Sequence, residues 1–533
     1  MTASPHVLHQ PTSNITNGLY YIYGAIALIT FGLVKYVYQT LNSPLRNVPG
    51  PMLARFTRLW ELQSIRNQDN PTFNIALHEK YGKMLQASSN IDAKATHRPL
   101  TKKGPVVRLA PNRYSINDAD AAKVILGHHN AMEKSRYYVP FATAGQHNMF
   151  SEPALAAHAK LRRPIAQLYS QTNLLSYEPF VDTCNAILIK RLEEYAQNGK
   201  TLDVRKLLQF YAFDVIGEIT TGSRFGLMED DGDRSGITSA IDGSLVYAAL
   251  IGLIPEWHWW ISKMADILGQ KSDIGKMFDF VGRHLDDRIS GRTKLPDDRS
   301  DFIDKLLSME QDGKAERIHT LTATFHNIAA GSDTTAISLT SALAHLTMYP
   351  NTLATLRREL DEATVSGNLS DPVTFQQAQK LPYLQACIME AMRVHPAVAA
   401  PMARVVGSQG LQIASTFFPP GTEVGVNAWV IHNNKSIFGP DAHVFRPERW
   451  LTDSKEERAV LDRNFLAFGN GPRTCIGKNI SLMEMSKVIP QIVRKYDFEI
   501  VPDGEGRRYS WTTRWFAKPN FKAVVSRRVQ KAE

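Results

Sequence analysis

The sequence predicts a mainly helical protein with a minor β part, preceded by one transmembrane helix. Three observations favour this fold class. An apolar run occupies residues 19–41, several long segments repeat apolar residues every three or four positions, and few segments alternate apolar with polar residues. With 43% hydrophobic and 21% charged residues, the chain has the composition of a globular protein. Its 533 residues can form several ordinary domains or one large enzyme domain.

The N-terminal run, LYYIYGAIALITFGLVKYVYQTL, carries a single charge at Lys35. It can cross a hydrocarbon core of about 30 Å, and tyrosines cluster at both of its ends, as they do at membrane interfaces. A cleaved signal peptide is the competing interpretation, but the run is too long for one and lacks a basic segment before it. Because residues 1–18 carry no lysine or arginine while several arginines follow the run, we expect residues 1–18 to be lumenal.

The segments beside the predicted anchor have distinct roles. Asn14 begins an N-I-T glycosylation sequon on the lumenal side, but so close to the membrane that we expect it to be unused. Residues 42–51 end in NVPGP, whose two prolines cannot continue a helix and make a stiff turn. We therefore expect residues 42–51 to be a proline-rich hinge and residues 52–533 to be the cytosolic catalytic domain.

Local patterns predict the elements of that domain in order. Residues 174–199 have helical apolar spacing and end in glycine, which is a helix stop. Residues 321–350 are apolar nearly all round and end in proline, so we expect a helix buried in the centre of the fold. Residues 419–434 begin with turn residues and then alternate, which predicts a pair of strands.

Residues 83–103 form a polar stretch without any pattern. If they are removed, the flanking sequence reads KYGPVVRLAP, a helix end that leads smoothly into a strand. Two interpretations stay open: a surface loop, or a retained intron that could be removed in frame between two glycine codons.

Charge and cysteine content narrow the function classes. The net charge of +9 indicates either a solvated surface or attraction to an acidic partner or anionic lipid. We find no zinc finger, RNA-binding motif or basic stripe interleaved with aromatic residues, so we expect no nucleic-acid partner. Cys184, Cys387 and Cys475 lie far apart, which excludes a disulfide framework and a C-x-x-C zinc site.

Cys475 lies in a loop, FGNGPRTCIG, although composition alone favours a buried, inert thiol. A thiolate is the metal-binding form of cysteine, and its pKa falls near cations and helix N-termini. Arg473 is adjacent, and the sequence after the loop has helical periodicity. Gly469, Gly471 and Gly477 allow a close approach of the backbone. The loop therefore indicates a thiolate presented to something large and flat.

This loop resembles the haem-binding loop of the cytochrome P-450 family, F-x-x-G-x-R-x-C-x-G, at Phe468, Gly471, Arg473, Cys475 and Gly477. The resemblance covers residues 45–520 or so and is strongest to fungal microsomal members of the pisatin demethylase kind. It implies the P-450 fold, haem b as cofactor, and Cys475 as the axial ligand of the haem iron. It also implies anchorage in the endoplasmic reticulum membrane.

Further motifs follow in the family's order. On its own, EAMR with Glu390 and Arg393 indicates a surface ion pair; the resemblance implies a buried charge network that these residues form with Arg449 of FRPERW. AAGSDTT places Asp333 and Thr334 inside the predicted central helix, either as a packed polar patch or in a functional role. The resemblance implies a locally opened helix there, at which these two residues deliver protons during dioxygen activation.

One motif departs from the family's pattern. The family often has W-x-x-x-R, whose tryptophan and arginine hold a haem propionate, whereas this chain has HAKLR. Arg162 keeps the position of the arginine, and His158 replaces the tryptophan but can still donate a hydrogen bond. The resemblance implies that Arg404 and Arg473 are the other propionate partners.

The resemblance implies a monooxygenase that inserts one oxygen atom of dioxygen into a small lipophilic substrate, by hydroxylation, demethylation or epoxidation, in fungal secondary metabolism. The chain has no flavin domain, so electrons would come from NADPH through a haemoprotein reductase. Two interpretations stay open for the basic residues that follow the loop, Lys478, Lys487, Arg494 and Lys495. They form either a docking face for the reductase or an ordinary solvated face of a helix. The alternatives are an oxygen-independent isomerase or dehydratase, which the Asp333–Thr334 pair disfavours, and a non-catalytic haem-binding membrane protein.

By the same resemblance, four segments line the substrate pocket: residues 137–150, residues 245–260, Ala329 with Ala330, and the loop after Pro396. Small side chains in that loop indicate room for a bulky lipophilic molecule. Two interpretations stay open for Trp257, Trp259 and Trp260, which either enter the membrane surface or pack in the core.

Overall fold

A computed structural model gives the fold of residues 13–82, 105–128, 131–143, 146–295 and 299–529, with side chains described from Tyr20 onward. Residues 1–12 and the unpatterned segment 83–103 lie outside the described residues. The described chain is mainly helical with small sheets, so the predicted fold class is confirmed.

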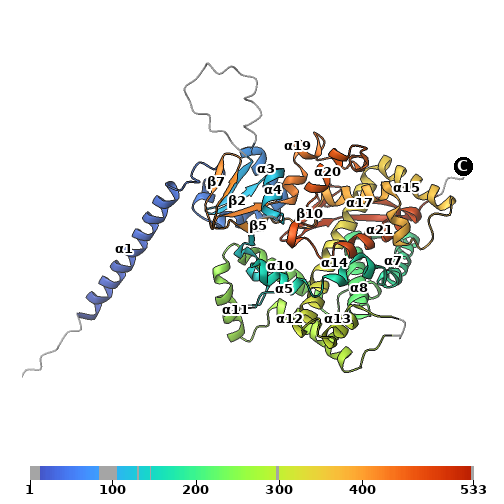
Figure 1. Cartoon of the computed structure of the whole chain (residues 1–533), viewed down its shortest axis with the longest axis horizontal. Helices are drawn as coiled ribbons and strands as arrows, with labels where there is room; N and C mark the ends of the chain where they lie inside the picture. The colour runs from blue at the N-terminus through green and yellow to red at the C-terminus, as the bar shows by residue number, and fades with distance from the viewer. Residues whose placement is uncertain (1–12, 83–104, 129–130, 144–145, 296–298, 530–533) are drawn as a thin grey trace, which may run out of the picture.

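Helix α1 (Ser13–Leu41) stands apart from the body of the molecule, as Figure 1 shows. Its segment Tyr20–Leu41 is long and apolar enough to cross a membrane, and its large apolar side chains are exposed. Burying such a surface in lipid is favourable, so α1 is a candidate single-pass anchor.

The segment that follows α1 packs on the body of the molecule. Arg108 donates its backbone N–H to the Pro49 carbonyl, 2.8 Å away. A Cβ at Gly50 would lie 2.7 Å from the Arg108 carbonyl oxygen, so this close approach requires glycine.

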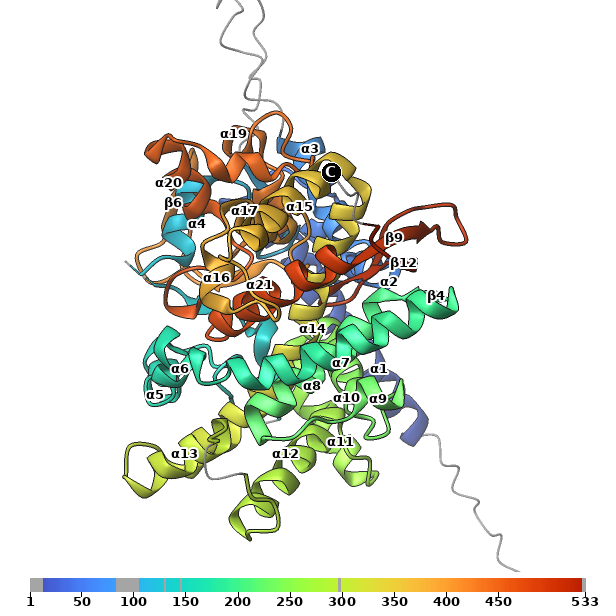
Figure 2. The ribbon, with the colours of Figure 1, turned by 90° about the vertical axis from the view of Figure 1, so that its right-hand side faces the viewer.

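Helix α14 (Arg317–Met348) runs through the middle of the body (Figure 2) and confirms the predicted central helix. It packs against the helices α8 (Val204–Thr221), α12 (Asp273–Ile289), α17 (Pro382–Val394) and α21 (Lys478–Lys495). Pro350 ends the run because it begins the next helix, α15 (Pro350–Val365). Helix α7 (Glu178–Asn198) stops at Gly199, which has φ of 65°, as its sequence predicts.

The largest sheet lies at the base of the anchor (Figure 1) and has the strand order β1-β2-β8-β5-β3. Its strands are β1 (Val106–Ala110), β2 (Arg113–Ile116), β3 (Glu133–Lys134), β5 (Met402–Val405) and β8 (Glu423–Val426). Strands β2 and β8 are parallel and the other pairs are antiparallel.

The strand pair predicted for residues 419–434 is wrong in its second half. Strand β8 is followed by helix α18 (Ala428–His432), because the Asn427 side chain caps the helix by accepting the Trp429 N–H at 2.9 Å. All five residues of α18 are buried, and periodicity alone cannot separate a fully buried strand from a short buried helix.

Three smaller sheets complete the fold. Strands β4 (Thr201–Asp203), β12 (Lys522–Arg527) and β9 (Tyr496–Val501) form one, and β6 (Leu411–Ile413) pairs with β7 (Thr416–Phe418). Strands β10 (Ser510–Thr513) and β11 (Ala517–Asn520) form a hairpin, whose turn carries Trp515 and Phe516.

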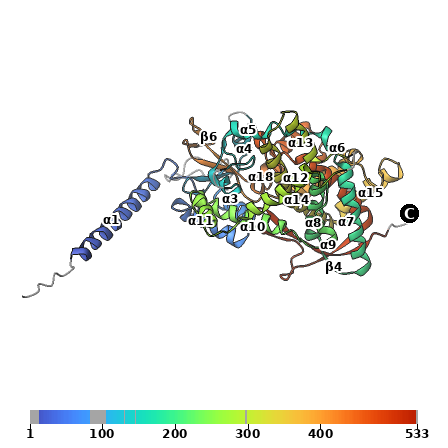
Figure 3. The ribbon, with the colours of Figure 1, turned by 90° about the horizontal axis from the view of Figure 1, so that it is seen from below.

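Helices α10 (Ile237–Ile251) and α11 (His258–Ile267) lie on the side of the body from which the anchor projects (Figures 1 and 3). Trp257, Trp259 and Trp260 are 60%, 47% and 59% exposed, with exposed apolar side chains following them along α11. The core-packing interpretation of these tryptophans is therefore wrong. An exposed apolar patch of this kind beside an anchor is suited to contact with a membrane surface.

Candidate active site

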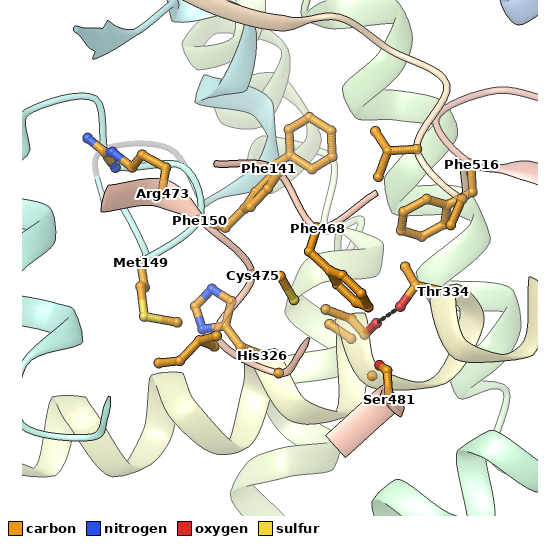
Figure 4. Close-up of a pocket in the computed structure, with 18 of the residues that line it drawn as sticks. Phe141, Met149, Phe150, His326, Thr334, Phe468, Arg473, Cys475, Ser481 and Phe516 are labelled. Atoms are coloured by element: carbon orange, nitrogen blue, oxygen red, sulfur yellow. Dashed lines mark hydrogen bonds between the residues drawn. The ribbon is translucent and has the colours of Figure 1, made fainter. Parts of the chain in front are cut away.

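A cavity of about 360 Å³ lies between α14, the Cys475 loop, α10 and the β10–β11 turn. All four segments expected around a substrate contribute to its wall, through side chains such as Phe150, Leu245, Ala330 and Val398. Trp515 and Phe516 of the hairpin turn also line it, which sequence reasoning missed. The exposed tryptophans around α11 do not line it. Most of the lining is apolar, and Figure 4 shows aromatic side chains converging on the region of Cys475.

The Cys475 side chain opens onto this cavity although protein surrounds it. Its loop is held by a hydrogen bond from the Cys475 N–H to the Phe468 carbonyl, at 2.9 Å. Gly471 has φ of 67°, and a Cβ there would lie 1.9 Å from the Leu126 carbonyl oxygen, so the loop can form only with glycine. A Cβ at Gly477, which lines the cavity, would meet no protein atom within 4 Å.

Burial raises the pKa of the Cys475 thiol above its usual value. The N–H groups of Gly477 and Lys478 and the charge of Arg162 act against this rise without cancelling it. The charges that act on the thiol come from Arg162 and Lys478, whereas the Arg473 guanidinium donates to the Glu152 and Pro153 carbonyls, both 2.6 Å away. This rise favours the neutral thiol, and a bound metal ion would favour the thiolate instead.

A cluster of cationic side chains lines the same cavity: Lys134, Arg162, Arg404 and Arg473. None of the four has a carboxylate within 4 Å among the described residues. Arg162 donates to the Thr474 carbonyl at 2.8 Å and Arg404 to the Ala403 carbonyl at 3.0 Å. Lys134 and Arg404 are buried, whereas Arg162 and Arg473 are half-buried. Buried positive charge without an acidic partner is strongly unfavourable, so this wall of the cavity favours an anion.

Lys134 is the member of this cluster that sequence reasoning missed, since β3 carries no motif. It is buried, donates to the Phe150 carbonyl at 2.5 Å, and lies 3.9 Å from the centre of the Phe150 ring. Burial and the charges of Arg404 and Arg473 lower the pKa of Lys134 well below its ordinary value. A bound carboxylate would reverse this effect.

His158 also lines the cavity and is buried. Burial and the charges of Arg473 and Arg162 lower its pKa to about 3. The imidazole is therefore neutral at physiological pH and offers one N–H donor, which is what a partner of a carboxylate needs.

The two residues expected to deliver protons lie on different sides of α14. Thr334 lines the cavity and donates to the Ala330 carbonyl at 2.9 Å. Asp333 is buried away from the cavity: it accepts from Gln209 at 2.6 Å, and the Lys518 ammonium lies 3.1 Å from its other oxygen. This contact between Lys518 and Asp333 is an ion pair without hydrogen-bond geometry, so that carboxylate oxygen has no hydrogen-bond partner among the described residues. The expected local opening of the helix is absent, since α14 is helical throughout.

Glu390, Arg393 and Arg449 meet in a fully buried network away from the cavity. Glu390 accepts from Arg393 at 2.7 and 2.8 Å, and from Arg449 at 2.9 Å. The interpretation of EAMR as a surface ion pair is wrong, because both side chains are 0% exposed. Burial would raise the pKa of Glu390, but hydrogen bonds and charges from both arginines hold it below its usual value. The network joins α17 to the 3₁₀ turn η6 (Pro447–Leu451).

The basic face expected beside the Cys475 loop is smaller than predicted. Lys478 is exposed, and Arg494 and Lys495 are partly exposed. Lys487 is buried and forms ion pairs with Glu178 and Asp182, the latter at 3.0 Å, so it is not part of a docking surface. It lies on the inner face of the amphipathic α21, which periodicity could have shown.

A cavity-facing cysteine on a glycine-shaped loop, next to cations that lack a carboxylate partner, has the chemistry needed to hold a haem through a thiolate. The chain belongs to the cytochrome P450 family, whose model matches residues 55–522. It is 40% identical to a pisatin demethylase of Fusarium vanettenii, over 94% of this chain and 93% of that protein. A second pisatin demethylase of this fungus is 38% identical, over 94% of each chain. A cytochrome P450 monooxygenase of Aspergillus terreus is 33% identical, over 89% of this chain and 94% of the relative.

Membership of this family makes the protein an oxidoreductase of the monooxygenase class. The family binds haem b and uses dioxygen, and its electrons come from NADPH through a partner reductase. The relatives named as monooxygenases favour oxygen insertion over the isomerase, dehydratase and non-catalytic alternatives.

Proposed function

We propose that this monooxygenase hydroxylates, demethylates or epoxidises a small lipophilic metabolite in fungal secondary metabolism. The observation that carries the proposal is the Cys475 sulfur, which opens onto an apolar cavity that Thr334 also lines. The names of the relatives in Fusarium vanettenii favour demethylation among the three reactions. The exposed apolar α1 supports a membrane anchor, and we place it in the endoplasmic reticulum membrane with residues 52–533 in the cytosol.

The residues present fit a haem, and each has a distinct task. Cys475 would hold the iron, and the N–H groups of Gly477 and Lys478 would stabilise its thiolate. Lys134, Arg162, Arg404 and Arg473, with His158 as a neutral donor, would bind the propionates. When bound, the haem supplies the oxidising chemistry of a thiolate-ligated iron.

Proton supply is the task of α14 and its neighbours. The Thr334 hydroxyl would hold a proton at the cavity wall. Asp333 pairs with Lys518, and Lys518 also pairs with Asp242, whose side chain is 50% exposed. We infer that this chain of charged side chains exchanges protons between solvent and Asp333, while Thr334 acts separately at the cavity wall.

The lining of the cavity sets the substrate class. Phe141, Phe150, Trp515 and Phe516 supply aromatic surface, and the small Val398 leaves space. A ligand bound there is therefore largely apolar, with its position fixed by few polar contacts.

The experiment combines the full-length protein in membranes with an NADPH-dependent haemoprotein reductase and a library of methoxylated aromatic compounds, under labelled dioxygen. The proposal predicts product formation that requires NADPH, reductase and dioxygen, with one labelled atom entering the substrate-derived products. Turnover that continues without dioxygen would contradict it.

A further inference from the structure

His326 lies on α14 about two helical turns before Thr334, so both residues occupy the same face of the helix. Its ring stands away from α14 toward the cavity, and Figure 4 shows it near Met149 and Cys475. The neighbouring Phe325 ring stacks on Phe278, with 4.3 Å between ring centres. The helix around His326 is thus held firmly by packing.

The hydrogen bonding of His326 fixes its tautomer. Nδ1 lies 2.5 Å from the Thr322 carbonyl oxygen, and a carbonyl can only accept, so Nδ1 carries the proton. Burial lowers the pKa of His326 to about 4, which leaves the ring neutral at physiological pH. Nε2 therefore presents a lone pair and no proton.

Nε2 has no hydrogen-bond partner among the described residues. Two other buried polar atoms on the cavity wall share this property, Arg473 Nε and Glu484 Oε2. The first belongs to the cationic cluster and the second lies on α21, on the Cys475 side. Among the described residues of α14 that line the cavity, His326 Nε2 is the unpaired acceptor, because Thr334 and Ser338 already donate to backbone carbonyls. Ser244 of α10 does so as well.

We propose that His326 is a specificity-determining residue, whose Nε2 accepts a hydrogen bond from a hydroxyl group of the substrate. This inference rests on the proposed function of the same cavity and narrows its substrate class to neutral, largely apolar molecules that carry a hydroxyl donor, such as phenols. A cationic donor is disfavoured because the charge of Lys134, which lines the same cavity, acts on His326. Leaving a buried acceptor unpaired is unfavourable, so a ligand that supplies the donor gains affinity over one that cannot.

The test compares matched probes that differ only in the donor: 2-naphthol with 2-methoxynaphthalene, and 4-hydroxybiphenyl with 4-methoxybiphenyl. Equilibrium dialysis measures the affinity of each probe for the haem-loaded, full-length protein. His326→Phe removes the acceptor and keeps an aromatic ring, so it should lower the affinity for the phenols about tenfold and leave that for the ethers nearly unchanged. Met149→Leu alters a neighbouring side chain without touching the acceptor and should keep the wild-type ratio.

Equal phenol-to-ether ratios in the wild type and in His326→Phe would overturn the proposal, and so would a wild type that prefers neither phenol. If His326→Phe does not fold, His326→Leu answers the same question. A substitution that changes the absorbance spectrum of the haem enzyme before any probe is added would show that His326 contacts the cofactor instead, which also overturns it. The carbon monoxide difference spectrum separates these failures from failure of the proposed function, because that spectrum reports the Cys475 thiolate alone.

Discussion

At the scale of single residues, Lys134 is the side chain whose charge depends most directly on the cofactor. Without an anion, burial and two arginines lower the pKa of Lys134 far below its ordinary value. A haem propionate would raise that pKa again, so haem binding should take up a proton. Haem affinity should therefore fall as the pH rises above the pKa that Lys134 has before haem binds.

This linkage gives a testable substitution. Lys134→Met should weaken haem binding about tenfold at neutral pH and abolish the part of the pH dependence that Lys134 causes. Absorbance titrations of the haem-free protein with haem, at pH values from about 6 to about 9, measure both effects. Lys123→Met, on the exposed face of helix α4 (Ala119–Leu126), is the control and should behave as wild type. An unchanged pH dependence in Lys134→Met would show that another group takes up the proton.

The glycines of the Cys475 loop should separate folding from haem binding. Gly471→Ala forces a Cβ against the Leu126 carbonyl at positive φ, so it should destabilise the protein by at least about 2 kcal/mol. Gly477→Ala meets no protein atom, so the haem-free protein should stay folded while haem binding suffers in the cavity. Thermal unfolding and haem content measure the two effects, and equal melting temperatures in both variants would contradict the packing argument.

At the scale of elements, the Glu390 network determines how α17 holds the chain that follows it. Glu390→Gln leaves two buried arginines short of their counter-charge and should lower the free energy of unfolding by about 3–5 kcal/mol. The thermal unfolding midpoint measures the effect, and Glu362→Gln on the exposed face of α15 is the matched control. A loss in Glu390→Gln no larger than in the control would mean that the network contributes nothing to stability.

The elements also show which parts of the molecule the sequence could predict. The central helix and the Cys475 loop were predictable because local signals define them: an all-round apolar run, and glycines around a cysteine. The prediction for residues 419–434 failed in its second half because alternation over a few buried residues does not distinguish a strand from a short buried helix. Lys134, His326 and Trp515 were missed for another reason: each joins the cavity through neighbours that are distant in the sequence. The buried Lys487 was misplaced because proximity along the chain to Cys475 was taken as proximity to the surface.

At the scale of the whole molecule, α1 should attach the enzyme to a membrane independently of the body. Lysines in place of Ile26 and Ile29 should each oppose insertion by about 3 kcal/mol and release the protein from alkaline-washed membranes. Val365→Lys, at a 90% exposed apolar position on α15, is the control and should leave the protein in the membrane fraction. If the double lysine variant also resists alkaline extraction, the anchor is not α1 alone.

The central claim is that Cys475 ligates a haem iron as thiolate, and the difference spectrum of the reduced, carbon monoxide-bound protein tests it most directly. Membranes with the full-length chain should give a strongly red-shifted Soret band. Cys475→Ala should abolish that band, whereas Cys387→Ala, at a buried thiol away from the cavity, should retain it. A red-shifted band that persists in Cys475→Ala would contradict the account.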